Sequence, residues 1–423
     1  MKKTTVRILL VAATLAIGIV LGLRQIAPPS VDQHSAMYPA YERMMDNIQR
    51  LAVEPHPSGS DAIDVVRAAL LSEITDMGLT PIVEEVPDRM VFMQNILVKI
   101  DAPGNERGIL FVSHYDSVPR SPGAADDMLS VCAMLEAMRA HAENDALQSD
   151  LYFLFTDGEE IRMLGARAFV NAHPELKDAI GMVVNLEARG NRGALLLFET
   201  SPKAYPLLQT VLRSGAKPVG FSWAAAVYEM MPNYTDFTAF LEHGYQGINL
   251  AAIEGAEHYH QPTDTFDNID RSTAWHYLHT TLALADYAAN NPLDGLRAAP
   301  SEAVYFPFLP GNTVLISGVA AYVLCAAACA LALAFGVMQA KNRRLKVSFS
   351  TVLMALLVLL SIGSAIFFIA GSYLFVIPLL AMAVTSFLKK WPVAHTVAQM
   401  ASGVVALLLW VPSLYLLWVS LIA

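Results

Sequence analysis

The segment GILFVSHYD, residues 108–116, is a run of apolar and β-branched residues that ends in a histidine and an aspartate. Its composition predicts a buried strand over residues 108–113. A second apolar run, LYFLFT at residues 151–156, is followed by DGEE at residues 157–160. The two runs therefore predict strands of one sheet, each with ionisable side chains directly after its last residue.

The same pattern continues on both sides of these two runs. Further strand-like runs occupy residues 81–86, 95–100, 180–186 and 194–198, and helix-like segments occupy residues 63–77, 127–142, 161–172, 203–214 and 272–289. This alternation predicts an α/β fold, with a largely parallel, mixed sheet covered by helices. Ligands bind at the carboxyl ends of the strands in such sheets, so polar residues at those ends are candidates for function.

Charge divides the 423 residues into an acidic middle part and two basic flanks. The chain is 55% hydrophobic and 16% charged, whereas about 25% of a soluble chain is normally charged. All 38 acidic residues lie between Asp32 and Glu302, which gives that part a net charge of −20, and the flanks carry +10. An acidic middle part argues against nucleic-acid binding, because phosphate contacts need a basic surface.

The flanks have the composition of membrane-spanning helices. Residues 1–24 combine a basic start with an uncharged run, which indicates an N-terminal signal anchor, with a cleaved signal peptide as the alternative. Residues 313–423 divide into four uncharged stretches, which predict all-α transmembrane helices at about 313–338, 349–370, 373–388 and 398–420. A lipid bilayer is therefore an expected partner.

The positions of Lys and Arg predict the topology, because short cytoplasmic loops are enriched in these residues. Basic clusters at residues 2–7, 341–346 and 389–390 fall on one side of five spans. This places the N-terminus in the cytoplasm and residues 32–295 outside it, with residues 296–312 as a linker. The compact length favours a bacterial inner membrane, with the outer part in the periplasm, over a eukaryotic endomembrane.

Four strand ends and one later loop carry acids or histidines. They are His114 and Asp116, Asp126 and Asp127, Glu159 and Glu160, Glu187, and the loop residues His258 and His260. Such groups are costly to bury unless they are paired or bind a metal. Imidazole and carboxylate without thiolate suits zinc, with cobalt or manganese as alternatives, and one carboxylate would bridge two ions.

The string HYDS…GAADD…FLFTDGEE…NLEARG…YHQPTDT, in order between residues 114 and 265, resembles the di-zinc aminopeptidase family. The motifs HPSGS at 56–60, NLEARG at 185–190 and PNYTDF at 232–237 are most similar to its endoplasmic-reticulum metallopeptidase and vacuolar membrane protease branch. The resemblance implies a zinc-exopeptidase type fold for residues 32–295 and two zinc ions per chain.

The resemblance also assigns the metal ligands. One zinc would be held by His114, Asp126 and Glu187, and the other by Asp126, Glu160 and His260, with Asp126 as the bridge. Asp127 competes with Asp126 but is expected at a helix N-cap. His258 competes with His260, which is preferred because it precedes the stretch ending in Asp264.

The remaining residues are given roles in catalysis and binding by the same resemblance. Asp116 would orient His114, and Glu159 would be the general base acting on a zinc-activated bridging water. Tyr234 and Asp236 are candidates for the substrate pocket. The implied activity is hydrolysis of N-terminal residues from peptides with a free α-amine.

Two other functions stay open. One is a glutaminyl-cyclase-like acyltransferase with a single working zinc, and the other is a pseudo-peptidase that acts as a binding or scaffold membrane protein. Intact Glu187 and Glu159 favour hydrolysis, and a pseudo-peptidase would normally have lost a ligand.

Overall fold

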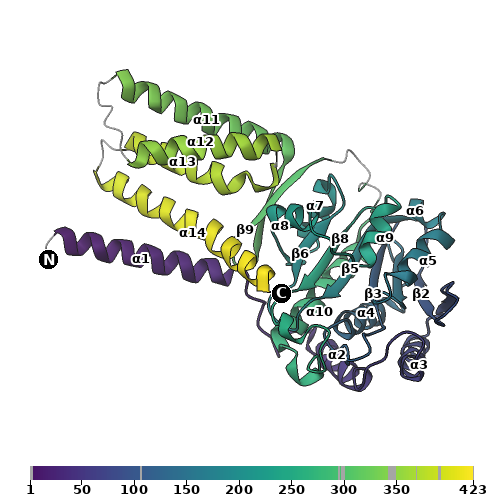
Figure 1. The fold of residues 1–423 in the computed structure, drawn as a ribbon. Coiled ribbons are helices and arrows are strands. Elements are labelled where there is room, and N and C mark those ends of the chain that lie inside the picture. Colours follow the sequence, from purple (N-terminus) through teal and green to yellow (C-terminus); the bar gives the residue numbers. More distant parts are fainter. Residues whose placement is uncertain are drawn as a thin grey trace. The chain divides into compact units, whose positions relative to one another are not determined.

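The computed structural model describes residues 3–104, 107–293, 296, 301–341, 349–367, 369–388 and 392–422, and these form two compact units (Figure 1). The α/β unit comprises Pro28–Val219, Val227–Pro300 and Val419–Ala423. The helical unit comprises Met1–Ala27, Gly220–Ala226 and Ser301–Trp418.

The α/β unit is built on a mixed sheet of eight strands in the order β1-β2-β4-β3-β5-β8-β6-β7. Strands β1 to β8 are Ile82–Glu85, Gln94–Ile100, Gly108–His114, Leu151–Thr156, Ile180–Ala188, Leu196–Thr200, Val219–Gly220 and Gly247–Ala252. The four central strands β4, β3, β5 and β8 are parallel, and β1, β2 and β6 are antiparallel additions. The predicted α/β fold with a mixed sheet is confirmed.

The central strands are continuous apolar runs because both faces of the sheet are covered. Every residue of β3, β4, β5 and β8 is buried. In the parallel register, His114 pairs with Thr156, and Val112 pairs with Asn185. The carboxyl ends of β3, β4 and β5 therefore lie side by side.

Helices lie on both faces of the sheet (Figure 1). Helices α2 (Tyr38–Leu51), α4 (Met128–His141) and α10 (Arg271–Asn290) contact one another, and α5 (Leu164–Ala172) contacts α9 (Asp236–Glu242). Leu110 and Val112 of β3 share a core cluster with Phe169 of α5 and Phe237 of α9. The other elements of the α/β unit are α3 (Asp61–Asp76), α6 (Leu176–Ala179), α7 (Tyr205–Arg213) and the 3₁₀ turns η1 (Ala256–His258) and η2 (Phe266–Asn268). Helix α8 (Ser222–Tyr228) begins in the helical unit, and its last two residues belong to the α/β unit.

Two expectations from the sequence need correction. Strand β8 lies inside the sheet but is missing from the predicted strands, because Gly247 and Asn249 interrupt its apolar run. The expected linker, residues 296–312, instead contributes β9 (Ala303–Leu309), which pairs with β10 (Asn312–Ser317) as a hairpin. The first helix after the hairpin therefore begins at Gly318, five residues after the expected boundary at residue 313.

The helical unit contains the apolar helices of both flanks. They are α1 (Lys3–Arg24), α11 (Gly318–Lys341), α12 (Phe349–Phe367), α13 (Tyr373–Phe387) and α14 (Pro392–Ile422), with the 3₁₀ turn η4 (Ile369–Gly371) before α13. Within the described residues, Gly318–Phe335 and Ala394–Val419 are long and apolar enough to cross a membrane. Shorter apolar helices occur at Ile8–Arg24, Leu353–Gly363 and Tyr373–Thr385.

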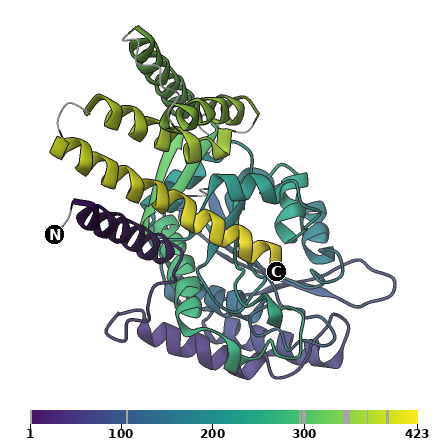
Figure 2. The same ribbon diagram turned by 60° about the vertical axis from the view of Figure 1, so that its left-hand side comes forward.

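Helices α1 and α14 lie side by side in both views (Figures 1 and 2). A Cβ atom added at Gly18 would lie 2.5 Å from Leu407 Cδ1, and one at Gly22 would lie 3.0 Å from Val411. Small residues four apart allow two membrane helices to approach closely. This packing suits a retained N-terminal anchor, and the five-span topology stays a prediction.

Candidate metal centre

Side chains from three strand ends and two loops meet at the carboxyl edge of the sheet. His114 is the last residue of β3, Glu187 is near the end of β5, and Glu160 follows β4. Asp126 lies in the loop before α4, and His260 lies in the loop after η1. The parallel register explains this convergence, because it aligns the ends of β3, β4 and β5.

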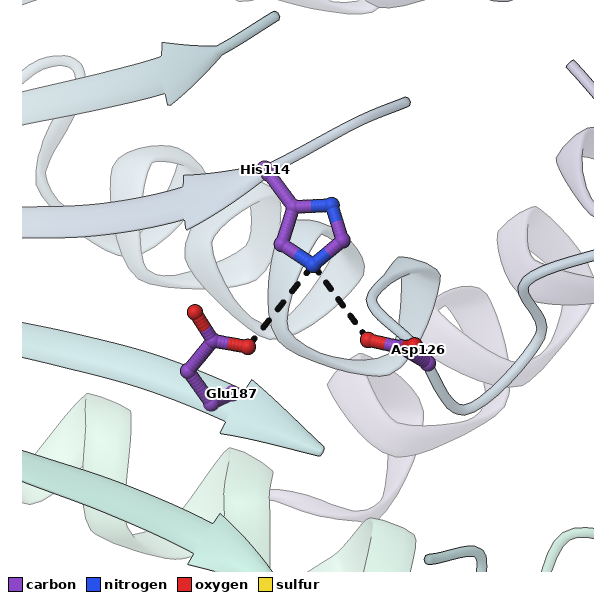
Figure 3. Close-up of side chains that lie close together, drawn as sticks. All are labelled: His114, Asp126 and Glu187. Atoms are coloured by element: carbon purple, nitrogen blue, oxygen red, sulfur yellow. Dashed lines mark ion pairs between the residues drawn. The ribbon is translucent and has the colours of Figure 1, made fainter. Parts of the chain in front are cut away.

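The first group consists of His114, Asp126 and Glu187, all buried (Figure 3). His114 Nε2 lies 3.3 Å from Asp126 Oδ1 and 3.7 Å from Glu187 Oε2. Its other ring nitrogen, Nδ1, is 2.9 Å from the backbone oxygen of Asp116, so Nδ1 is the donor and Nε2 is free as an acceptor.

The second group consists of Asp126, Glu160 and His260. His260 Nε2 lies 3.3 Å from Asp126 Oδ2 and 3.0 Å from Glu160 Oε1. Asp126 therefore directs Oδ1 to the first group and Oδ2 to the second. A carboxylate with this arrangement is suited to bridge two cations.

The residues present fit a pair of metal ions. In each group the candidate ligand atoms lie within 4.8 Å of one another. Glu160 Oε1 and His260 Nε2 are buried and form no hydrogen bond, which is costly unless another partner is bound. Nitrogen and oxygen donors without sulfur suit zinc.

The electrostatics of the two histidines reflect the surrounding carboxylates. Burial opposes protonation of His260, but the neighbouring carboxylates of Asp126 and Glu160 raise its pKa to about 9. Burial likewise opposes protonation of His114, and its acidic neighbours, Asp116 first, raise its pKa well above the usual value. Cations are therefore favoured at both positions, whether as protons or as metal ions.

Asp116 forms hydrogen bonds with residues of both ligand groups, namely with His114 of the first and with the backbone of Glu160 of the second. Its Oδ1 accepts the N–H of Glu159 at 3.2 Å, and its Oδ2 accepts the N–H of Glu160 at 3.3 Å. Its carboxylate is 3.5 Å from His114 Nδ1, farther than the backbone oxygen that this nitrogen contacts. The side chain of Asp116 thus mainly holds the Glu159–Glu160 turn, while its backbone oxygen orients His114.

A serine of the HPSGS motif, residues 56–60, contacts the Asp116 carboxylate. In the sequence this motif was noted only as part of the family resemblance, and no role was predicted for it. Ser58 Oγ is 2.6 Å from Asp157 Oδ1 and 3.2 Å from Asp116 Oδ2. The backbone N–H of the buried His56 donates to Ser117 Oγ at 2.9 Å, and the backbone oxygen of His56 accepts the N–H of Ser117 at 3.3 Å. Burial, then the charge of Asp116, raises the pKa of Asp157 to about 6.

The loop that carries His260 also holds Asp126 in place. Asp264 Oδ1 accepts the N–H of Ala125 at 2.8 Å, and Oδ2 accepts that of Asp126 at 3.2 Å. The Tyr259 ring stacks on the His260 imidazole with centroids 3.7 Å apart. His260 has a φ of 56°, a left-handed conformation that costs a non-glycine residue energy and often marks a functional site.

Glu159 is half-buried beside the first group but belongs to neither group. Burial, followed by the charge of Glu187, raises the pKa of Glu159 well above its usual range. Its backbone N–H is fixed by Asp116. These features suit a residue that gains and loses a proton.

The structure separates the competing candidates. Asp127 occupies the N-cap position of α4, but its side chain bonds to the hydroxyls of Ser113 and Ser130. His258 Nδ1 contacts Thr263 Oγ1 at 2.9 Å and belongs to neither group. Among the described residues, Asp126 and His260 are thus the members that meet the other predicted ligands.

The two residues expected in the substrate pocket lie in different environments. Tyr234 is 62% exposed. Asp236 is fully buried at the start of α9, where Oδ2 accepts a hydrogen bond from Thr156 and Oδ1 forms none. Their proposed contact with substrate stays a prediction.

Comparison with known proteins finds a similarity to one peptidase family. The model of peptidase family M28 matches residues 95–285, which include both metal groups. The vacuolar membrane protease of Candida dubliniensis is 28% identical over 284 residues, covering 62% of this chain and 30% of that protein. The chain thus spans less than a third of the length of such curated relatives. The resemblance found in the sequence is confirmed.

Two solved structures are similar to this chain, and the fold likeness rests on the first of them. Glutaminyl cyclase from Porphyromonas gingivalis is 18% identical with a TM-score of 0.50, covering 58% of this chain and 97% of that one. The aminopeptidase of Aneurinibacillus sp. strain AM-1 is 13% identical with a TM-score of 0.48, covering 60% and 94%. At these identities the likeness concerns the fold alone, so function must be argued from the site.

Proposed function

We propose, on the premise that the chain carries a catalytic domain of peptidase family M28, that it is a membrane-anchored zinc aminopeptidase. The observation that carries this proposal is the orientation of Asp126, whose two oxygens face two separate ligand groups. His114 and Glu187 would complete one zinc site, and Glu160 and His260 the other. The substrates would be peptides with a free N-terminus.

The chemistry follows from the residues around the two groups. Bound zinc would supply Lewis acidity toward a water molecule and the scissile carbonyl. Glu159, held at its backbone by Asp116, would take a proton from the attacking water and give it to the leaving amine. Its raised pKa favours keeping that proton until it is delivered.

Several features favour hydrolysis over the cyclase and pseudo-peptidase alternatives. Both ligand groups are complete, whereas a cyclase would need only one working zinc. The charge of Glu187 acts on Glu159, and the two groups hold the residues expected as ligands, which supports hydrolysis. The apolar helices suit a bilayer anchor, and the expected location is a bacterial inner membrane with the α/β unit in the periplasm.

The test uses the full-length protein purified in detergent with a panel of aminoacyl-coumarin substrates and with glutaminyl peptides. We expect release of coumarin that stops on chelation and returns with zinc. Glu159→Gln should lower kcat at least 1000-fold and keep two zinc ions per chain, because its carboxylate is in neither ligand group. Cyclisation of N-terminal glutamine without aminoacyl hydrolysis, or full activity of Glu159→Gln, would contradict the proposal.

A further inference from the structure

A row of polar side chains leads from the metal centre across the sheet. Asn185 of β5 pairs with Asn249 of β8, which pairs with Glu199 of β6. Asn185 is two residues from Glu187, so both side chains face the same side of the sheet. Two strand spacings separate β5 from β6, which places Glu199 about 10 Å along the row from Asn185.

Hydrogen bonds connect this row from one end to the other. Asn185 Nδ2 lies 3.4 Å from Glu187 Oε1 and donates at 3.0 Å to Asn249 Oδ1. Asn249 Nδ2 donates at 2.9 Å to Glu199 Oε2 and at 2.8 Å to Thr235 Oγ1. The Glu199 carboxylate is thus held in a fixed position relative to the metal ligand Glu187.

Glu199 has no cationic partner among the residues that the structure describes. It is half-buried, and its hydrogen bond from Asn249 uses only one carboxylate oxygen. The buried Asn185 Oδ1 accepts no hydrogen bond either. By contrast, the buried Glu136 is paired with Arg43 at 2.7 Å. The row therefore presents negative charge and unused acceptors that a cation would satisfy.

Tyr228 provides an aromatic wall beside this row. Its ring packs edge-on against Phe198, the residue before Glu199, with centroids 4.7 Å apart. Burial and then the charges of Glu199 and Glu187 raise the pKa of the Tyr228 hydroxyl. The charges of Glu199 and Glu187 thus both act on the Tyr228 hydroxyl, and the charge of Arg189 opposes them. A carboxylate next to an aromatic ring suits a Lys or Arg side chain.

We propose that Glu199, together with Tyr228, binds the cationic side chain of an N-terminal Lys or Arg of the substrate. The inference rests on the proposed function, because it assumes that the scissile bond lies at the metal centre. A long basic side chain can then extend along the row and place its charge at Glu199. The substrate's α-ammonium group, next to the scissile bond, would stay near the metal ligands instead.

The test compares kcat/KM for arginyl- and leucyl-coumarin substrates, with full-length wild-type protein and Glu199→Gln. We expect wild type to prefer arginine and the ratio to fall at least tenfold in the variant. Glu143→Gln is the matched control, because Glu143 is an exposed acid in the turn after α4, and its ratio should stay within twofold. Zinc content and thermal denaturation establish that each variant is folded and loaded.

The outcomes distinguish this inference from the proposed function. If kcat/KM of the wild type is tenfold higher for the leucyl than for the arginyl substrate, the inference is wrong, while the proposed aminopeptidase activity is supported. This result needs no variant and holds even if Glu199→Gln fails to fold. Equal losses for both substrates would show that Glu199 does not bind the side chain. No hydrolysis of any aminoacyl substrate by zinc-loaded wild type would overturn the proposed function itself.

Discussion

Ser58 offers a direct test of whether the HPSGS motif supports the metal centre, because the same motif contains its own control. Ser58→Ala removes a hydroxyl that contacts Asp157 at 2.6 Å and Asp116 at 3.2 Å. Ser60→Ala removes the N-cap of α3, whose Oγ accepts the N–H of Ile63 at 3.2 Å. Only the first hydroxyl touches a residue that holds the Glu159–Glu160 turn.

The two variants should lose similar stability. A hydrogen bond to a charged group contributes roughly 1.5–3 kcal/mol, and the low end applies to Ser58, because Asp157 retains the N–H of Gln94 and the hydroxyl of Tyr115. Loss of an N-cap costs about 1 kcal/mol. Thermal denaturation of the metal-free proteins should therefore give similar downward shifts in Tm.

Zinc affinity should separate the two variants. Removing a group that directly supports a ligand typically costs about 10–100-fold in metal affinity. Ser58 acts one contact further away, through Asp116, so we expect the low end, roughly tenfold. The assay is competition for zinc between the full-length apo protein and a fluorescent chelator. Equal zinc affinities for Ser58→Ala and Ser60→Ala would refute the proposed support.

Three further predictions concern the metal count, the topology and pH. Asp126→Asn should lower bound zinc from two ions per chain to at most one, because Asp126 belongs to both ligand groups. Zinc is measured by atomic emission, and two ions per chain in the variant would exclude Asp126 as the bridging ligand. If the α/β unit lies in the periplasm, a cysteine introduced by Met90→Cys, at a position that is 91% exposed, should react with an impermeant maleimide in intact spheroplasts. A cysteine introduced by Thr5→Cys should react only after lysis. The reverse pattern would show that the predicted topology is inverted. Burial, with a smaller contribution from Glu229, raises the pKa of Glu199 to about 7, and Asn249 opposes the shift. Since Glu199 gains its negative charge as pH rises through 7, the arginyl-to-leucyl ratio of kcat/KM should rise between pH 6 and pH 8 and stay flat in Glu199→Gln.

The alternation of strand-like and helix-like segments along the chain was enough to predict the α/β fold. Parallel strands buried on both faces must be continuous apolar runs, and β3, β4 and β5 have that composition. Strand β8 was missed because Gly247 and Asn249 break the run; Gly247 packs closely on Val183, and Asn249 carries the polar row. These are tertiary requirements that have no local pattern.

The candidate ligands could also be identified from the sequence. Burying acids and histidines directly after apolar strands costs free energy unless these side chains are paired or bind a metal. The choice of His260 over His258 rested on resemblance. The structure adds a physical reason, since His260 faces Asp126 and Glu160 whereas His258 bonds to Thr263.

What only the tertiary structure decided is which distant residues act on one another. Ser58 meets Asp116 across 58 residues, and Glu199 meets Asn249 across 50. Local sequence specifies whether a segment forms a strand or a helix, because that depends on neighbouring side chains. The partners across strands depend on sheet order and register, which arise from packing of the whole unit. The support of the metal centre and the charged row at Glu199 were therefore visible only in the folded chain.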